Sequence, residues 1–559
     1  MNLRALVPVA VAAYVAFPAT ATGLYGDDAS DANLNGFLAE RGESLLSAAW
    51  ATSALWVRAN GRLFPVYVLE KYAVFHWFPD VTAYKWFLFA LTLVTVAAFV
   101  WFTGVLAGGA FAAVAGTIAA VSLQMRGYHD ALYSYNGMVQ IMLLVLIASL
   151  WCWRSYLLSG SRALGALALA LYALNGLTYE FSYLFFPLYA CVAPARGARG
   201  VFAALWPPAA VSACLIAVAL GLRAHATIAP GTAYAVGREP AGYALAFARQ
   251  ATAALPLSYF AWNPSRIFPP LGNAFARTAS YALNPVGLVL LAAAAVAVLL
   301  PYVRRGPVPA GRDALRLAGL GAGLWLLPGA LVAASAKYQR ELEWGIGYLP
   351  VLISVFGVAI LGALLLGAAA GAARRGGAGV WLVVLAGAAI GLAGALTRAD
   401  NERVALELRP WLIGRAAVAA ALNRGAFGAV PDGAAVTVSG PLPWLCLGQD
   451  GCPDDLDGRY FVFAHAGKRV ELGPAPGRPG AVRLRYGAAK TVLAVVVADG
   501  PDGASRVYLA AAGPGCTAPA LAGSRRLAAG PGWTLSSVEP AVAGAASLET
   551  SCGTVELPG

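Results

Sequence analysis

The chain opens with "ALVPVAVAAYVAFPATATGLYGDDASDANLNGF" (residues 5–37), in which an apolar run ends shortly before two adjacent acids, Asp27 and Asp28. Residues 5–22 hold no charged side chain, and a helix that crosses a bilayer needs roughly 20 apolar residues. Acids placed directly after such a run mark a membrane edge. This stretch therefore predicts a membrane protein and raises the question of what the two acids do there.

Composition extends the membrane prediction to most of the chain. Of the 559 residues, 59% are apolar and 12% are charged, and the mean hydropathy is +0.67. We expect an α-helical polytopic membrane domain over residues 1–397 with about eleven transmembrane helices, although the sixth segment is short for a span. No internal repeat with a fixed period is visible. The expected segments are 5–22, 84–106, 109–124, 137–157, 163–179, 181–195, 201–222, 281–303, 314–335, 346–370 and 379–397.

Arginines set the expected orientation, because short loops that carry Arg stay cytoplasmic. With the N-terminus inside, the inner loops hold Arg4, Arg154, Arg162, Arg196, Arg199, Arg304, Arg305, Arg312, Arg374 and Arg375. An odd number of crossings then places the C-terminal region outside. A cleavable signal peptide over residues 1–22 is the alternative for the first segment, and it also leaves residue 27 outside. The net charge of +12 is partly explained by these arginines and needs no nucleic-acid partner.

From residue 398 the chain turns polar, and we expect residues 398–559 to form a soluble, β-rich extracytoplasmic domain. Residues 401–424 have a helical pattern that Pro410 interrupts. Short stretches rich in β-branched and aromatic residues then predict strands of a small sandwich-like domain. A carbohydrate-binding or acceptor-guiding role and a purely structural role both stay open for it. The predicted strands are "AAVTVSG", "RYFVFAH", "AVRLRYG", "TVLAVVVADG", "SRVYLAAAG" and "GWTLSSV".

Four of the seven cysteines lie in this C-terminal region. An even number in a region expected outside the cell favours disulfides, and the spacing favours Cys446 with Cys452 and Cys516 with Cys552. A zinc site is the weaker alternative, because neither pair has the two-residue spacing of such sites.

Polar residues gather on the expected outer face of the membrane domain. The long first outer loop, residues 23–83, contains an amphipathic stretch at 44–58 that suits either an interfacial helix or a helix buried against the protein. Charged side chains at the mouths of several helices predict a polar cavity that opens to this side. Besides the acid pair, the candidates are Arg62, Arg126, His129, Asp130, Tyr133, Glu180, Lys337 and Arg340.

A short first transmembrane helix, an acidic pair, interfacial helices, many further spans and an external C-terminal region resemble the GT-C superfamily of membrane glycosyltransferases. Asp27-Asp28 is similar to the acidic pair of that superfamily, and "GRLFP" at residues 61–65 gives weaker support. The resemblance covers nearly the whole chain but identifies no single family. It implies a polyprenyl-phosphate sugar as donor, which fits the absence of a glycine-rich nucleotide fingerprint.

Inverting transfer from a sugar phosphate needs a base that takes the proton of the attacking hydroxyl, and we expect Asp27 in that role. Asp28 orients the acceptor or shares this function, and solvation of a helix end is the alternative for both acids. Arg340, Lys337 and Arg62 are the expected partners of the donor phosphate, the alternative for the first two being ion pairs with Glu341 or Glu343. Residues expected to bind acceptor or sugar, or else to have structural roles, are Arg126, His129, Asp130, Tyr133 and Glu180.

The sequence is also compatible with two other classes of membrane protein. A transporter or lipid flippase would also have many spans, although repeated halves or charged, broken helices near mid-bilayer are expected there. A non-catalytic scaffold that presents the C-terminal region is a third possibility. The sequence requires no cofactor, and a divalent metal is possible but unknown. Richness in Ala, Gly, Arg and Pro suggests a bacterial inner membrane, where the acceptor would be a glycan, a lipid or a protein.

Overall fold

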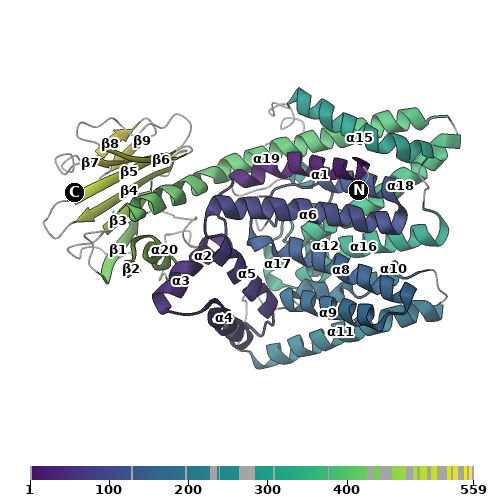
Figure 1. Cartoon of the computed structure of the whole chain (residues 1–559), viewed down its shortest axis with the longest axis horizontal. Helices are drawn as coiled ribbons and strands as arrows, with labels where there is room; N and C mark the ends of the chain where they lie inside the picture. The colour runs from purple at the N-terminus through teal and green to yellow at the C-terminus, as the bar shows by residue number, and fades with distance from the viewer. Residues whose placement is uncertain are drawn as a thin grey trace. The chain divides into compact units, whose positions relative to one another are not determined.

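The structure is a computed structural model of the whole chain (Figure 1). It describes residues 3–126, 130–194, 198–226, 236–237, 239–262, 284–305, 309–375, 377–424, 432–439 and 456–473, and seven strand segments between residues 482 and 556. Helices dominate the first three quarters of the chain, as the composition predicts.

Seven helices in the described ranges are long and apolar enough to cross a membrane. Three further apolar helices are shorter: α1 (Leu3–Ala16) continued by η1 (Phe17–Ala21), α7 (Gly109–Val121) and α9 (Arg162–Thr178). Together these ten elements coincide with ten of the eleven expected segments. The seven long helices are α6 (Val81–Ala107), α8 (Met138–Ser159), α11 (Ala198–His225), α15 (Pro285–Arg305), α16 (Gly311–Ala333), α18 (Val351–Arg375) and α19 (Gly379–Asn423).

The prediction of a transmembrane helix at 181–195 is wrong. This segment forms the 3₁₀ turn η3 (Glu180–Phe185) and the short helix α10 (Leu188–Val192). Pro187, which has no backbone N–H, stands at the start of α10. Irregular backbone at membrane depth is tolerated only where protein surrounds it, and here Tyr172 donates a hydrogen bond of 2.9 Å to the Tyr183 carbonyl.

This irregular segment still runs from one end of the α8–α9 helix pair to the other. At one end Asn175 of α9 donates a hydrogen bond of 2.9 Å to the Met142 carbonyl of α8, close to residue 179. At the other end Arg154 of α8 donates one of 3.0 Å to the Val192 carbonyl. Helices α8, α9 and α11 lie alongside one another (Figure 1). The segment thus joins the two ends of the helix pair by largely buried, non-helical backbone.

Short helices occupy the loops that flank the long ones. In the first loop, Leu46 and Trp50 of α4 are strongly exposed, which fits the interfacial interpretation of this helix. The short elements are α2 (Asp27–Asp31), α3 (Leu34–Arg41), α4 (Leu45–Asn60), α5 (Pro65–Trp77), η2 (Tyr135–Gly137), α12 (Pro240–Ala253), α13 (Ser258–Trp262) and α17 (Ala336–Glu341).

The chain divides into two compact units. The first holds Met1–Thr20, Ala49–Glu70 and Trp86–Val404, and the second holds Ala21–Ala48, Lys71–Lys85 and Ala405–Gly559. The second unit therefore combines the acid-pair segment with the C-terminal region. Helix α19 is continuous through residue 410, so the predicted interruption at Pro410 is absent.

In the described part of the C-terminal region, the chain forms helix α20 (Leu456–Ala466) and nine strands. The prediction of a strand at "RYFVFAH" is wrong, because these residues belong to α20, where contacts with α3 override their β propensity. Seven strands form one sheet in the order β2-β1-β3-β4-β5-β7-β6, in which β1 is parallel to β2 and β3 and the other pairs are antiparallel. Strands β8 and β9 form a separate pair, so the described strands make one large sheet and a hairpin rather than a sandwich.

The strand bounds are β1 (Ala434–Ser439), β2 (Val470–Gly473), β3 (Val482–Tyr486), β4 (Val492–Asp499), β5 (Ser505–Ala512), β6 (Arg525–Gly530), β7 (Trp533–Val538), β8 (Ser547–Thr550) and β9 (Gly553–Glu556).

Candidate functional site

The two adjacent acids lie in different environments. Gly26, with φ of 58°, turns the chain into α2, whose first two residues are Asp27 and Asp28. Consecutive helical residues point about 100° apart, and here Asp27 is exposed while Asp28 is 1% exposed. One carboxyl is thus open to solvent and the other is enclosed by the protein.

Asp28 is enclosed by the start of α6. The phenol of Tyr84 donates a hydrogen bond of 2.6 Å to Asp28 Oδ2, and the Lys85 side chain is equally buried nearby. Burial raises the pKa of Asp28 to about 7, although the positive charge of Lys85 and the Tyr84 hydrogen bond act in the opposite direction. A pKa raised this far above the ordinary range is unusual for an aspartate, and burial is its main cause.

The third acid of this helix forms an ion pair. Lys71 Nζ lies 2.7 Å from Asp31 Oδ1, and both side chains are largely buried. Burial alone would lower the pKa of Lys71, but the charge and hydrogen bond of Asp31 raise it above its ordinary value. Lys71 consequently stays charged and neutralises Asp31, and Asp27 is left as the acid of α2 that faces solvent.

A second polar group lies in the other unit and joins two predicted site residues, Arg62 and Glu180, that are 118 positions apart. Arg62 Nε lies 3.1 and 3.2 Å from the two Glu180 oxygens, and its Nη2 lies 2.7 Å from Oε2. Arg223, at the end of α11, donates a hydrogen bond of 3.2 Å to Glu180 Oε1. We call these three residues the arginine cluster.

Electrostatics hold the arginine cluster in its charged form. Burial alone would raise the pKa of Glu180, but the charges and hydrogen bonds of Arg62 and Arg223 lower it below its ordinary value. One carboxylate between two guanidinium groups leaves a net charge of about +1 in a poorly hydrated place, which suits an anion. Glu180 here fits the alternative expectation of a satisfied acid, because it holds both arginines.

The "GRLFP" stretch builds the arginine cluster. Gly61 has φ of 61°, and a Cβ at this position would lie 2.6 Å from Arg223 Cα, so glycine permits the close approach to α11. The Arg62 guanidinium lies over the rings of Phe64 and Tyr179, at 4.7 and 5.1 Å from their centroids. Pro65 then begins α5, a position that tolerates the missing N–H.

Lys337 and Arg340 lie on α17, a helix without a buried residue. Lys337 Nζ is 3.8 Å from Glu341, a contact that fits the ion-pair alternative. The helix is nonetheless linked to the neighbourhood of the arginine cluster. The Tyr338 ring packs at a tilt against Tyr348 with 4.2 Å between centroids, and the Tyr348 hydroxyl lies 3.0 Å from that of Tyr179.

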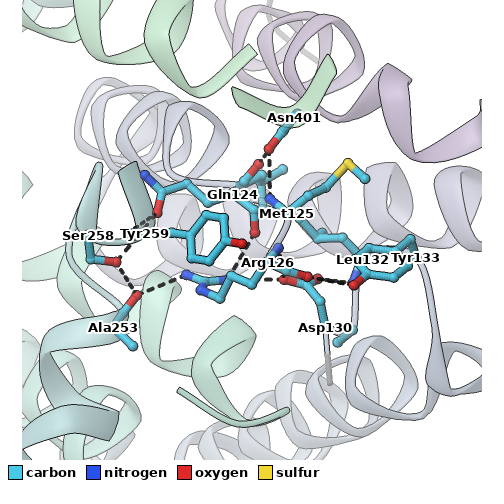
Figure 2. Close-up of polar contacts among 12 residues, drawn as sticks. Gln124, Met125, Arg126, Asp130, Leu132, Tyr133, Ala253, Ser258, Tyr259 and Asn401 are labelled. Carbon is cyan, nitrogen blue, oxygen red and sulfur yellow. Dashed lines mark hydrogen bonds and ion pairs between the residues drawn. The ribbon is translucent and has the colours of Figure 1, made fainter. Parts of the chain in front are cut away.

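Arg126, Asp130 and Tyr133 form a closed network (Figure 2). Both charged side chains are buried, Arg126 Nη1 lies 3.4 Å from Asp130 Oδ2, and Arg126 Nη2 donates a hydrogen bond of 2.9 Å to the Ala253 carbonyl. Asp130 accepts backbone hydrogen bonds from Arg126 and Leu132, and the Tyr133 hydroxyl donates to the Arg126 carbonyl. This geometry fits the structural alternative, in which the three residues fix the backbone at residue 126 and at residues 130–133.

Five predicted site residues, His129, Cys446, Cys452, Cys516 and Cys552, lie outside the described residues. Within the described part of the chain, no group of three or more His, Cys, Asp or Glu side chains is arranged to hold a metal ion.

Four residues of the acid-pair surroundings and of the arginine cluster were not among the site residues expected from the sequence, although Lys71 was expected on the outer face. Arg223 ends an apolar helix, where an arginine is ordinarily explained by snorkelling to the interface. Lys71, Tyr84 and Lys85 lie in or near aromatic-rich sequence. Lys85, which has Tyr84 and Trp86 as neighbours, was the sequence signal for a buried charge here.

No known protein-family model matches the chain, and no curated protein matches it in sequence. Among solved structures, the chain is similar to the crystal structure of ArnT from Cupriavidus metallidurans bound to undecaprenyl phosphate. The similarity covers 95% of this chain and 97% of that one, with 13% sequence identity and a TM-score of 0.38. The function proposed below therefore rests on the residues of this chain.

Proposed function

We propose that the protein is a membrane glycosyltransferase that moves a sugar from a polyprenyl-phosphate donor to an acceptor hydroxyl on the outer face of the membrane. The observation that carries the proposal is the division of the acid pair. Asp27 is exposed where a membrane helix has just ended, and Asp28 is buried under Tyr84 with a pKa near neutrality. A purely solvating pair would expose both acids.

In the proposed reaction Asp27 is the general base. It takes the proton of the acceptor hydroxyl while the hydroxyl oxygen attacks the anomeric carbon of the donor. The bond between this carbon and the phosphate oxygen breaks, its electron pair leaves with the polyprenyl phosphate, and the anomeric configuration inverts. Asp28 orients Asp27 and the acceptor from its fixed place beside Tyr84.

The arginine cluster is the proposed partner of the donor phosphate. Arg62 and Arg223 supply guanidinium groups that bind phosphate oxygens by charge-assisted hydrogen bonds, and Glu180 holds them in place. Its net positive charge offsets the charge that develops on the leaving phosphate. Lys337 and Arg340 are the proposed second contribution, because α17 lies beside Tyr348, whose hydroxyl reaches Tyr179.

The proposed topology has a cytoplasmic N-terminus in a bacterial inner membrane and a periplasmic C-terminal region over residues 398–559. Helices α4 and α5 are not among the described helices long and apolar enough to cross a membrane, which supports one outer loop that holds both Asp27 and Arg62. We take residues 181–192 as a further, non-helical crossing, which the hydrogen bonds at the two ends of the α8–α9 pair support, and the number of crossings is then odd. A water-borne or lipid-bound acceptor in the periplasm then meets a donor that stays in the bilayer.

The test is sugar transfer by the purified protein in lipid nanodiscs, with a panel of radiolabelled polyprenyl-phosphate sugars and envelope glycans as acceptors. Asp27→Asn removes the base and is expected to lower transfer by at least about 100-fold, at the lower end of what such a base contributes. Asp313→Asn makes the same chemical change at an exposed acid of α16 and is expected to leave the rate unchanged.

Transfer by the wild type together with normal turnover in Asp27→Asn would refute the role of Asp27. If no donor is consumed but one crosses the bilayer in proteoliposomes, a flippase replaces the proposed enzyme.

A further inference from the structure

Arg415 is a buried arginine of the C-terminal half of α19, with 5% of its surface exposed. Its Nη2 donates a hydrogen bond of 2.7 Å to Asn33 Oδ1, and its Nη1 lies 3.5 Å from the Ala29 carbonyl oxygen. The guanidinium also lies 4.6 Å from the centroid of the Phe461 ring of α20. Burying a guanidinium costs free energy unless its hydrogen bonds are satisfied. We therefore expect the contacts of Arg415 to have a specific structural role.

The two oxygens that Arg415 contacts belong to the segment of the acid pair. Ala29 directly follows Asp28, and Asn33 directly precedes the next helix, α3. The Asn33 amide nitrogen itself donates a hydrogen bond of 3.3 Å to the Ala29 carbonyl. The Arg415 guanidinium, the Asn33 amide and the Ala29 carbonyl thus contact one another on the C-terminal side of Asp27 and Asp28.

Helix α2 has only five residues, and a helix this short is not stable alone. It therefore depends on what surrounds it for its orientation. At its N-terminal side, the Gly23 amide donates a hydrogen bond of 3.1 Å to the Leu408 carbonyl of α19. Helix α19 therefore contacts the acid-pair segment both before and after the two acids.

Helix α20 fixes the following helix, α3. The Phe37 ring packs edge-on against Tyr460 with 5.1 Å between centroids, and Arg459 Nε lies 3.4 Å from Glu40 Oε2. Gly36 leaves no room for a Cβ against the Tyr460 carbonyl. Residues 23–40 are thus held by two helices from the C-terminal region of the chain.

We propose that Arg415 is a positioning residue for the acid pair, and that α19 and α20 hold α2 so that the Asp27 carboxylate keeps its orientation toward the acceptor. This inference rests on the proposed function. It assigns the C-terminal region a part in the reaction, because residues almost 400 positions away set the geometry of the base.

Substitutions at both partners test the inference in the full-length protein in nanodiscs. Arg415→Met and Asn33→Ala each are expected to lower kcat by about 10- to 100-fold, the range for a displaced catalytic group, with the donor KM unchanged. Arg415→Lys keeps the charge but lacks the two-pronged guanidinium, and an intermediate kcat is expected. The double variant is expected to be no slower than the slower single variant, because both remove one interaction.

Arg424→Met is the matched control, since Arg424 is exposed just beyond the end of α19. It is expected to keep wild-type kcat and KM. Wild-type kcat in Arg415→Met, or multiplicative losses in the double variant, would overturn the inference while leaving the proposed function intact.

Amide hydrogen exchange provides a readout that needs no activity. The amides of residues 27–37 are expected to exchange about tenfold or more faster in Arg415→Met and at the wild-type rate in Arg424→Met, because local opening follows the loss of tertiary contacts. Unchanged exchange in Arg415→Met overturns the inference. If the wild type transfers no sugar, the proposed function fails, and faster exchange still shows that α19 holds α2.

Discussion

Asp28 and Tyr84 are 56 positions apart in the chain and are joined by a hydrogen bond of 2.6 Å from the phenol to the carboxyl. Both side chains are 1% exposed. This contact ties the acid-pair helix to the first turn of α6. It also explains how two adjacent aspartates acquire different chemistry, because the one that Tyr84 covers is removed from water and its neighbour is not.

The raised pKa of Asp28 predicts how stability varies with pH. Its pKa lies near 4 in an unfolded chain and at about 7 in the folded protein, because burial disfavours the charged carboxylate. Between these values the folded state binds more protons, so stability falls as pH rises from about 4 to about 7. Asp28→Asn removes the titrating group, and the fall that Asp28 causes, on the order of 4 kcal/mol for about three pKa units, should disappear.

Thermal unfolding of wild type and Asp28→Asn between pH 4 and 8 measures this difference. As pH rises, the unfolding temperature of Asp28→Asn should increase relative to that of the wild type. Asp313→Asn, at a side chain that is 75% exposed, should give a curve parallel to the wild type. Parallel curves for Asp28→Asn would contradict the prediction.

Length and hydropathy were sufficient to predict the membrane helices, because a bilayer imposes both on any helix that crosses it. They failed at residues 181–195, where a composition as apolar as that of a span folds as a turn and a short helix. Pro187 was the local signal, but the decisive cause is burial by α8, α9 and α16, which sequence does not display. The same cause turned "RYFVFAH" from an expected strand into α20.

The sequence identified several residues of the candidate site but not which of them contact one another. Arg62 and Glu180 were both identified as charged groups on one side of the membrane, but their pairing spans 118 positions and depends on the close approach at Gly61. Arg415 was missed because the helix that carries it was assigned to the C-terminal region. A hydrogen bond between residues as far apart in the chain as Arg415 and Asn33 cannot be predicted from the periodicity of the sequence.

The arginine cluster predicts a strong effect of Glu180→Gln. Removing the carboxylate leaves Arg62 largely buried without its counter-charge, which destabilises the protein by about 3 kcal/mol, the lower end for a broken buried pair. The pKa of Glu180 is lowered in the folded state, so its contribution is present above about pH 4.5 and is lost as pH falls through the folded value. The donor KM should also rise, since both arginines lose their anchor.

Glu341→Gln is the control for Glu180→Gln, because Glu341 pairs with Lys337 at 3.8 Å on an exposed helix. Its effect on unfolding should stay within about 0.5 kcal/mol. Chemical denaturation in detergent and donor titrations give the two quantities. Equal stability of the two variants at pH 7 would show that the arginine cluster contributes no more than an exposed ion pair.

A third prediction concerns the place where glycines bring the backbones of helices α16 and α18 together. A Cβ on Gly357 of α18 would clash with the backbone of α16 at the Gly321 carbonyl and the Trp325 amide, neither of which can turn away. Without a hydrophobic driving force between helices in lipid, such backbone contacts determine the association. Gly357→Ala should therefore destabilise the protein by about 2 to 3 kcal/mol, as overpacking does elsewhere.

Gly371→Ala on the same helix separates this clash from the ordinary preference of a helix for alanine. A Cβ at Gly371 would meet no atom within 4 Å, so alanine there should be neutral or stabilise by up to about 1 kcal/mol. We expect Gly357→Ala to lower the unfolding temperature and Gly371→Ala to leave it unchanged or raise it. Shifts of the same sign would mean that the approach at Gly357 relaxes at little cost and that α16 and α18 are held together by their other contacts.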